Sequence, residues 1–409
     1  MKLNKWTVGL AAVGAISLSS AVQAEETEMN VVNSMTSGTT ISGYVSTAFS
    51  YNFNTANNGV DRADPLGDQK ANGFALDVVN LTVEKPLDES EWAAGYKAEL
   101  LFGPDATGYN PSENADDDSD FAIKQAYVNV RTPVGNGLEF KMGVFDTIIG
   151  YESFNYPDNP NYTRSLAWGL EPTQHTGLLA SYQINDIVSV MGGIADTTDA
   201  AINKFAVDTG GANRTKDQWN LTYMGAVAVT APEDMGALAG STWYGGVLYG
   251  RTDAPSASTS VSSGGNQTSW YTGLTLATGV EGLSVGAAFD YLNYQDSGSA
   301  AADPNNGSAW VGGLYASFQA SEKLSFHARG EYMRLNSAFA TFVELDDSPA
   351  EAWEGTLTAQ YDLWANVISR LEFRWDNRNY RDVGGWNDFG DAQGDLSNAY
   401  SIMLNVIHV

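Results

Sequence analysis

The residues of this chain that could do chemistry are charged and aromatic side chains on, and opposite, one long segment at 146–177. The segment carries the first candidate group: Asp146, Tyr151, Glu152, Phe154, Tyr156, Asp158, Arg164, Trp168 and Glu171. A set of bases elsewhere in the chain is predicted to face it: Arg131, Lys141, Arg329, Arg370 and Arg374. Opposed carboxylates and bases create a transverse field, which orients polar solutes and penalises apolar ones. This chemistry suits the passage of a hydrophilic solute and needs no catalytic residue.

A hydrolytic site is the alternative that the residue types allow. Only three histidines could serve as a general base, and one of them, His327, shares a predicted strand face with Ser325 and Glu331. These side chains loosely resemble a serine, histidine and acid set. Polar groups on such a face are common without catalysis, so we predict that the protein is not an enzyme. We also predict neither a metal nor a cofactor, since we identify no metal-ligand spacing and no cofactor motif.

Acidic residues dominate the charge balance. The formal net charge is −28, and the most acidic run is Asp116-Asp117-Asp118-Ser119-Asp120. The run lacks the turn glycine of an EF-hand loop, and we interpret it as a solvated loop. A negative surplus of this size repels nucleic acid phosphates and attracts cations. Nucleic acid is therefore excluded as a partner, and cations are favoured.

The start of the chain has the features of a secretory signal. Two lysines precede a short apolar run at 6–18, and small residues at 22–24 form a cleavage site. A retained transmembrane helix needs about 20 apolar residues, and serines interrupt this run first. We predict a signal peptide at 1–24, a polar lead at 25–38 and one barrel domain at 39–409. Because Cys is absent, the exported chain has no disulfides to stabilise it.

A strict period of two recurs along most of the chain. In 366–378, for example, apolar and charged residues alternate as Leu371-Glu372-Phe373-Arg374-Trp375. Alternation with one apolar face predicts half-exposed strands. Charged residues on the inward face of so many strands would disrupt the dry core of a soluble sandwich. The pattern instead predicts an all-β transmembrane barrel, apolar outside and polar inside.

Connection lengths support this architecture. Short links alternate with links that mostly exceed ten residues, as in outer-membrane barrels with short periplasmic turns and long external loops. About sixteen antiparallel strands are predicted: 39–53, 73–85, 91–103, 121–132, 137–145, 176–184, 187–196, 217–230, 241–251, 268–279, 282–294, 307–319, 323–335, 352–363, 366–378 and 398–409. Around 73–79 the alternation slips as at a β-bulge. The segment 146–177 is then the third external loop. Entering the lumen or covering its mouth would bury the same aromatic residues, and we expect it to fold inward.

Part of the chain resembles a known family. The segments GLEFKMGVFDTIIGYESF, NPNYTRSLAWGLEPTQHTGLLASY and QAYVNV, within 125–182, resemble the OmpL-like β-barrel porins of Gram-negative outer membranes. The layout is also similar to that of sixteen-stranded general porins, whose third loop forms a constriction. The resemblance implies a homotrimer in the outer membrane, in contact with lipid and lipopolysaccharide. One departure is the C-terminal Ile407-His408-Val409, where such barrels usually end in an aromatic residue.

The expected function is passive diffusion of small hydrophilic solutes and ions through a water-filled channel that prefers cations. A sixteen-stranded barrel is too wide for its side chains to fill, so an inward loop would set the size cutoff. The loop aromatics allow a saccharide-selective channel instead, because Tyr151, Phe154, Tyr156 and Trp168 could stack on sugar rings. A structural or adhesin barrel is the other alternative, and it would be favoured by a plugged lumen. For each wall charge, an internal ion pair that only shapes the lumen is as good an interpretation as a direct role in transport.

Overall fold

The computed structural model describes residues 38–53, 72–106, 120–198, 202, 221–252, 265–296, 307–336, 350–379 and 398–409. The predicted signal peptide, nearly all of the polar lead and the acidic residues 116–119 lie outside this part of the chain. Sixteen strands are present: β1 (Thr40–Asn52), β2 (Gly73–Lys85), β3 (Ala93–Phe102), β4 (Phe121–Thr132), β5 (Leu138–Asp146), β6 (Gln174–Gln183), β7 (Val188–Ala195), β8 (Thr222–Thr230), β9 (Thr242–Thr252), β10 (Gly265–Ala277), β11 (Leu283–Asp296), β12 (Gly307–Gln319), β13 (Leu324–Leu335), β14 (Ala350–Trp364), β15 (Val367–Asn379) and β16 (Asn398–His408). Short 3₁₀ turns complete the described elements: η2 (Pro104–Ala106), η3 (Tyr156–Asp158), η4 (Ala167–Gly169) and η5 (Glu233–Leu238).

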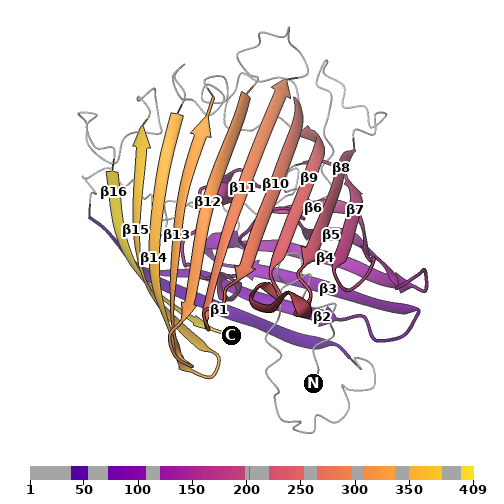
Figure 1. Ribbon diagram of the computed structural model, residues 1–409, viewed down its shortest axis with the longest axis horizontal. Helices are drawn as coiled ribbons and strands as arrows, with labels where there is room; N and C mark the ends of the chain where they lie inside the picture. Colours follow the sequence, from indigo (N-terminus) through magenta and orange to yellow (C-terminus); the bar gives the residue numbers. More distant parts are fainter. Residues whose placement is uncertain are drawn as a thin grey trace.

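The strands form one closed antiparallel barrel (Figure 1). Each strand pairs with its neighbours in sequence, and β1 closes the ring by pairing with β16, with Val45 opposite His408. The predicted all-β antiparallel barrel and its strand number are thus confirmed. The short connections gather at one end, where the C-terminus also lies. No helix in the described residues is long and apolar enough to cross a membrane.

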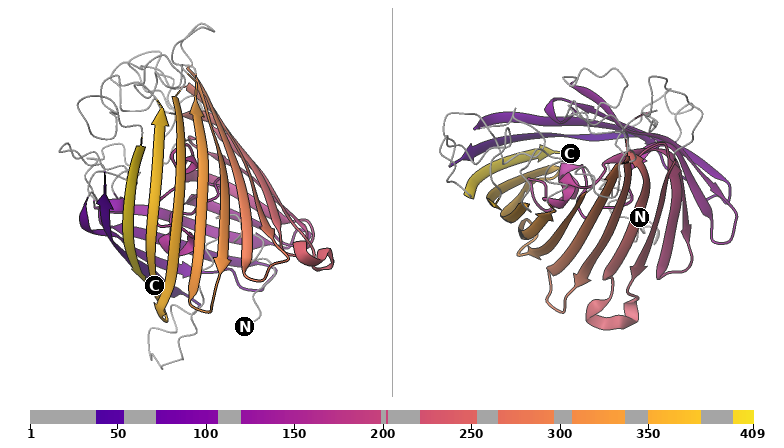
Figure 2. Two further views of the ribbon diagram at one scale, coloured as in Figure 1. Left: turned by 60° about the vertical axis from the view of Figure 1, so that its left-hand side comes forward. Right: turned by 90° about the horizontal axis from the view of Figure 1, so that it is seen from above.

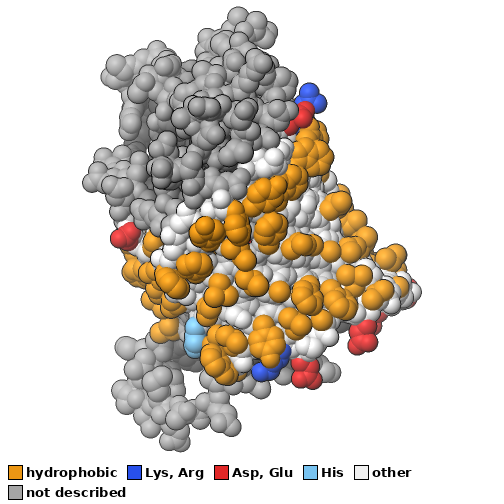
Figure 3. Space-filling model, turned by 90° about the vertical axis from the view of Figure 1, so that its left-hand side faces the viewer, with side chains coloured by type: hydrophobic (Ala, Val, Ile, Leu, Met, Phe, Trp, Pro, Cys, Tyr) orange, Lys and Arg blue, Asp and Glu red, His pale blue; other side chains and the backbone are white. Residues whose placement is uncertain are grey.

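The period of two places alternate side chains on opposite faces of the wall. Large apolar residues point outward and are highly exposed, such as Met142 at 71% and Leu314 at 69%. Figure 3 shows them as a broad apolar belt in which charged side chains occur only near the edges. Inward residues such as Glu354 and Arg370 are buried. Apolar outside and charged inside is the arrangement that the alternation predicted.

One strand boundary and one bulge compare with the prediction in an informative way. The strand predicted from 217 begins at Thr222 in the described part of the chain, and Trp219 lies outside that part. In β2, the register shifts so that Ser46 faces Val78 while Thr47 faces Leu76, which leaves Asp77 as an extra residue. The predicted bulge is therefore confirmed. Its effect is to turn a fully buried carboxylate inward at Asp77.

Candidate functional site

Residues 147–173, between β5 and β6, form a loop that folds into the barrel, and we call it the lumenal loop. Its base is closed by a hydrogen bond from the Thr147 N–H to the Thr173 carbonyl, 3.1 Å long. In the view from above in Figure 2, its coil lies inside the ring of strands. Its aromatic residues Phe154, Tyr156 and Tyr162 are at most 6% exposed. The expected inward fold is therefore present, and the loop contacts three sections of the wall.

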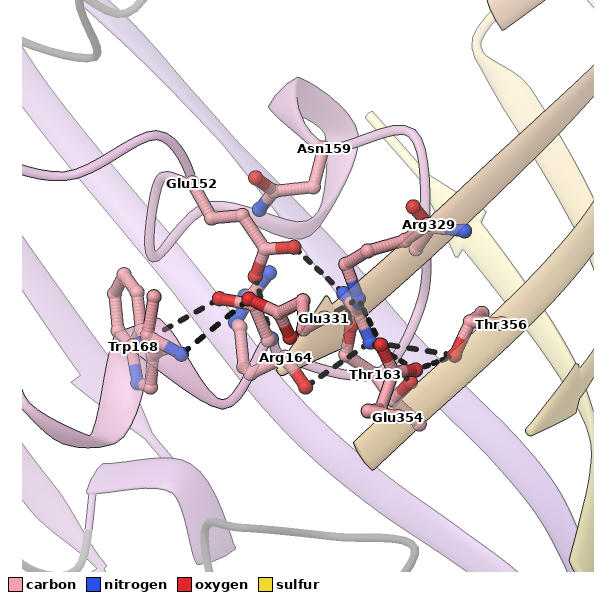
Figure 4. A network of polar contacts seen from close by, with 12 residues as sticks. Glu152, Asn159, Thr163, Arg164, Trp168, Arg329, Glu331, Glu354 and Thr356 are labelled. Carbon is pink, nitrogen blue, oxygen red and sulfur yellow. Dashed lines mark hydrogen bonds and ion pairs between the residues drawn. The ribbon is translucent and has the colours of Figure 1, made fainter. Parts of the chain in front are cut away.

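Arg329 of β13 is the centre of the first contact (Figure 4). Its guanidinium lies 2.6 Å from Glu152 of the loop and 3.1 Å from Glu354 of β14. It also donates to the carbonyls of Thr163 and Arg164, at 2.7 and 3.1 Å. The side chain is 0% exposed, so all of this takes place away from water. A planar guanidinium suits such a site, because it offers five donors in a fixed fork.

Two wall carboxylates hold the backbone of the same loop. Glu372 of β15 accepts the N–H groups of Tyr162 and Thr163 at 2.6 and 2.9 Å, and the Thr163 hydroxyl at 2.6 Å. Glu331 of β13 accepts the N–H of Leu166 at 2.6 Å. The hydrogen bonds join the loop backbone to carboxyl groups that are buried in the wall. They also satisfy backbone donors that a buried loop would otherwise leave unpaired.

Two further arginines of β15 bind loop carbonyls. Arg370 donates to the carbonyls of Tyr156 and Asn159, at 2.9 and 2.6 Å. Arg374 donates to the carbonyl of Arg164 at 2.5 Å and pairs with Asp376 at 2.8 Å. Neither side chain is more than 3% exposed. Three of the five predicted bases, including Arg329, therefore lie against the loop, but they are covered by it rather than presented to the lumen.

The second contact is with β1 and β2 and the 3₁₀ turn after β3. The Tyr156 hydroxyl donates to Asp105 at 2.7 Å, and the Tyr162 hydroxyl donates to Asp77 at 2.8 Å. The two tyrosine rings stack with their centroids 5.5 Å apart. Around them lies an apolar cluster: Tyr44, Ala48, Val78, Leu101, Ala106, Ala122, Phe154, Met403 and Ile407. This side of the loop is attached by packing as well as by hydrogen bonds.

The third contact is with β9 to β12. The Tyr151 ring stacks on Tyr315 with centroids 4.0 Å apart, and its hydroxyl lies 3.3 Å from the Thr275 hydroxyl. The Tyr244 hydroxyl donates to the Ile148 carbonyl. Gly286 of β11 allows this close approach, since a Cβ there would come within 2.0 Å of the Tyr151 hydroxyl. With contacts on three sides, the loop spans the interior of the barrel.

The contacts described for the other two predicted bases, Arg131 and Lys141, are not with the lumenal loop. Arg131 lies close to the short β4–β5 turn, pairs with Glu139 at 2.6 Å and donates to the Asp88 carbonyl at 2.7 Å. Lys141 has its ammonium 5.0 Å from the centre of the Tyr127 ring. The prediction of five bases opposite the loop is thus wrong for Arg131. Its strand face is the inward one, but its height in the barrel is that of the short β4–β5 turn.

The loop acids differ in their partners. Asp146 pairs with Lys124 of β4 at 2.6 Å, a base that the sequence reasoning did not select. Asp158 keeps an exposed side chain. Glu171 faces Asp290 of β11, so a carboxyl meets a carboxyl where the prediction placed a base. Burial, followed by the charges of Asp290 and Glu152, raises the pKa of Glu171 well above its usual range.

This raised pKa predicts that the Glu171 end of the loop loosens as the pH rises. The folded protein keeps a proton on Glu171 that an unfolded glutamate loses above about pH 4, so the stabilisation is lost between that pH and the raised pKa. Glu171→Gln should remove the pH dependence. The pH dependence of this opening is measured by amide hydrogen exchange of residues 166–173, after correction for the intrinsic exchange rates. Equal pH dependence in wild type and variant would rule the interpretation out.

Arg164 occupies an unusual position for a cation. It is 1% exposed, and its guanidinium lies between the Tyr156 and Trp168 rings, 4.7 and 5.2 Å from their centroids. One of its nitrogens donates to the Phe154 carbonyl. Stacking on aromatic faces offsets part of the cost of burying this charge. The aromatic faces that could have stacked on a sugar are therefore largely used within the loop itself.

Sequence reasoning missed the acids that hold the loop. They are buried acids of the wall and of one turn. Two of them share strands with predicted bases, and the others lie elsewhere: Glu331 of β13 and Glu372 of β15, with Asp77 of β2, Asp290 of β11, Glu354 of β14 and Asp105 of η2. Their position on the inward face was available as a signal. Which of them meet backbone N–H groups depends on the conformation of the loop, which has no regular pattern.

The hydrolase-like set does not assemble. His327 lies between two serine hydroxyls, 3.0 Å from Ser325 and 2.9 Å from Ser317, whereas Glu331 is engaged by the loop backbone. Gly282-Leu283-Ser284-Val285-Gly286 matches a nucleophile-elbow motif in letters, but it runs into strand β11 instead of turning into a helix. Within the described residues, no group of three or more His, Asp or Glu side chains could hold a metal ion.

A closed sixteen-stranded barrel with an apolar belt and an inward loop defines the class of outer-membrane porins. The family model of beta-barrel porin-2, OmpL-like, matches residues 38–407, and the chain belongs to that family. A search of the curated proteins finds no significant match.

Solved structures of outer-membrane barrels are similar to this fold. The outer membrane channel DcaP of Acinetobacter baumannii has a TM-score of 0.59 at 11% identity, over 90% of this chain and 96% of that chain. An anion-selective porin from Comamonas acidovorans has a TM-score of 0.57 at 12% identity, over 90% of this chain and 99% of that chain. OmpT of Vibrio cholerae in a trimer form has 0.56 at 12%, again over 90% and 99%. At these identities the likeness concerns the fold alone.

Proposed function

We propose that the protein is a water-filled channel for passive diffusion of small hydrophilic solutes and ions, and that the lumenal loop is its constriction. The observation that carries this proposal is the attachment of the loop to three sections of the inner wall. A barrel of sixteen strands otherwise encloses a wide aqueous lumen. A loop fixed across it narrows the passage, and its buried ion pairs keep the narrowing rigid.

Cation preference is the selectivity that the charges support. The chain carries a formal net charge of −28. Among the loop acids, Asp158 is exposed, whereas Arg329, Arg370 and Arg374 are buried against the loop. Mobile ions therefore meet more uncompensated carboxylate than guanidinium.

A general channel is favoured over a saccharide-selective one. Tyr151 is stacked on Tyr315, and Tyr156 lies between Tyr162 and Arg164, so these rings have little free face for a sugar. We place the protein in the outer membrane of a Gram-negative bacterium after export by its signal peptide, surrounded by lipid and lipopolysaccharide. A homotrimer is the assembly we propose, as the trimer form of the Vibrio cholerae protein illustrates for this fold.

Single-channel recording of the refolded, signal-free protein in a planar bilayer tests the function. We expect stable open steps and, under a salt gradient, a reversal potential directed toward the cation. Circular dichroism with a strong β signature and a shift in gel mobility on heating establish that the barrel is folded. Silence from a folded barrel would refute the channel and favour a structural or adhesin barrel. An anion-directed reversal would refute only the cation preference.

A further inference from the structure

A slot on the outer surface of the barrel, over β12 to β16, is not used by the channel. It has a volume of about 460 Å³ and is lined mainly by apolar side chains, among them Phe318, Phe326, Ala328, Ala359, Leu371 and Phe373. It reaches down to β13 and β14 at His327 and Thr358, whose side chains point to the interior. We call this feature the outer slot.

The register of four strands explains the hollow. Ala328 pairs with Ala316 on one side and Leu357 on the other, while Ala359 pairs with Phe326 and Leu371. Small residues therefore sit diagonally to one another, with large side chains around them. The large neighbours protrude from the wall: Phe326 is 46% exposed and Leu371 is 52% exposed. The hollow thus results from alanines at outward positions of adjacent strands.

The height of the slot places it in one leaflet. Phe326 is the third residue of β13, which starts at Leu324 directly after the short turn at 320–323. At about 3.3 Å per residue, the slot begins roughly 7 Å above that turn. Short turns face the periplasm in outer-membrane barrels. The outer slot therefore opens toward the periplasmic leaflet.

The edge below the slot has the residues of a lipid headgroup region. Trp364 is 70% exposed and Tyr361 is 45% exposed, as expected of an interfacial aromatic girdle. The ammonium of Lys323 lies beside them, 3.4 Å from the Leu363 carbonyl, and provides a positive charge at this edge. A lipid with a phosphate at Lys323 could lay its tail directly into the slot, because the two features are adjacent along the strands.

We propose that the outer slot is a binding site for one acyl chain of an anionic phospholipid of the periplasmic leaflet, with its phosphate at Lys323. The slot is continuous with the apolar belt that faces the bilayer, seen in Figure 3. It is a hollow lined mainly by apolar side chains, which fits an acyl chain. The charge at its periplasmic edge complements a phosphate. The proposal rests on the membrane location of the barrel and not on conduction.

Native mass spectrometry tests the site. The full mature chain in detergent is titrated with palmitoyl-oleoyl phosphatidylglycerol, and the fraction of protein that carries one bound lipid is measured. Ala359→Phe fills the slot and should weaken the first lipid binding step by roughly tenfold. Lys323→Gln should weaken it severalfold for phosphatidylglycerol and leave uncharged diacylglycerol binding unchanged. Ala94→Phe, at an exposed outward alanine of β3, is the matched control and should bind as wild type does.

The outcomes separate the candidate occupants. Equal lipid binding by wild type and Ala359→Phe would overturn the proposal. So would preferential retention of lipopolysaccharide at this site, because that lipid belongs to the opposite leaflet. Dissociation of a homo-oligomer by Ala359→Phe with unchanged lipid binding would assign the slot to a second copy of the chain and overturn the lipid. Conductance measured in parallel shows whether the channel itself is intact in each variant.

Discussion

Arg329→Ala is expected to release the lumenal loop from β13 to β15 and to raise single-channel conductance, with noisier open steps. The substitution removes a guanidinium that binds Glu152 at 2.6 Å and the Thr163 carbonyl at 2.7 Å. Glu152 and Glu354 then remain buried without the Arg329 guanidinium between them. Removing one partner of a buried ion pair typically lowers the stability of the folded state by about 3–5 kcal/mol. The strands keep their own hydrogen bonds, so the loop is the part that can move to relieve this cost.

The same strand offers a matched control. Arg334 lies near the other end of β13, is half-exposed and pairs with Glu351 at 3.9 Å. Exposed pairs contribute only about 0–1 kcal/mol, so Arg334→Ala should conduct as wild type does. Arg329→Lys keeps the charge without the planar fork and should fall between the two. Wild-type conductance in a folded Arg329→Ala barrel would show that Arg329 does not hold the constriction.

Removal of the loop itself should have the larger effect. Deleting residues 152–171 and joining the ends with a short Gly-Ser linker is expected to increase the conductance steps severalfold, since it leaves the wide lumen of a sixteen-stranded barrel. The ends can be joined because Thr147 and Thr173 are already hydrogen-bonded, at 3.1 Å. The deletion also removes the exposed carboxylate of Asp158, so the reversal potential should move toward zero.

The measurement is the same planar-bilayer recording, with circular dichroism and heat-dependent gel mobility to confirm the barrel. Steps no larger than those of wild type in a folded deletion variant would contradict a constricting role. The constriction would then have to lie in another part of the chain.

The fold was largely predictable because a membrane barrel repeats one rule on every strand. Segments such as 366–378 alternate apolar and charged residues, and β15 follows that alternation from Val367 to Asn379. Turn and loop lengths supplied the strand order. Even the bulge at Asp77 appeared as a slip in the pattern. The start of β8 was less predictable, since residues before Thr222 continued the alternation without being part of the described strand.

The site was predictable only in part. The alternation of the strands correctly placed Arg329, Arg370 and Arg374 on the inward face, against the loop. It does not give the position of a residue along the barrel axis, and Arg131 lies at the short β4–β5 turn instead. The partner of Glu171 could not be foreseen, because a sequence does not show that a loop carboxyl meets the Asp290 carboxyl across the lumen. The aromatic residues were correctly selected as buried, yet their ring faces are used within the protein.

The seam between β1 and β16 determines the order in which the chain can fold. The Asn405 amide donates to the Ser46 hydroxyl at 2.9 Å across 359 residues, and Ser46 donates to Asp77, which also accepts the Tyr162 hydroxyl of the lumenal loop. Contacts between such distant residues form late, because the entropy of closing the intervening chain must be overcome first. Until β16 is in place, β1 and β15 keep open edges that can pair with other chains. Loop docking beside the seam therefore couples completion of the interior to ring closure, and the placement of β16 completes both.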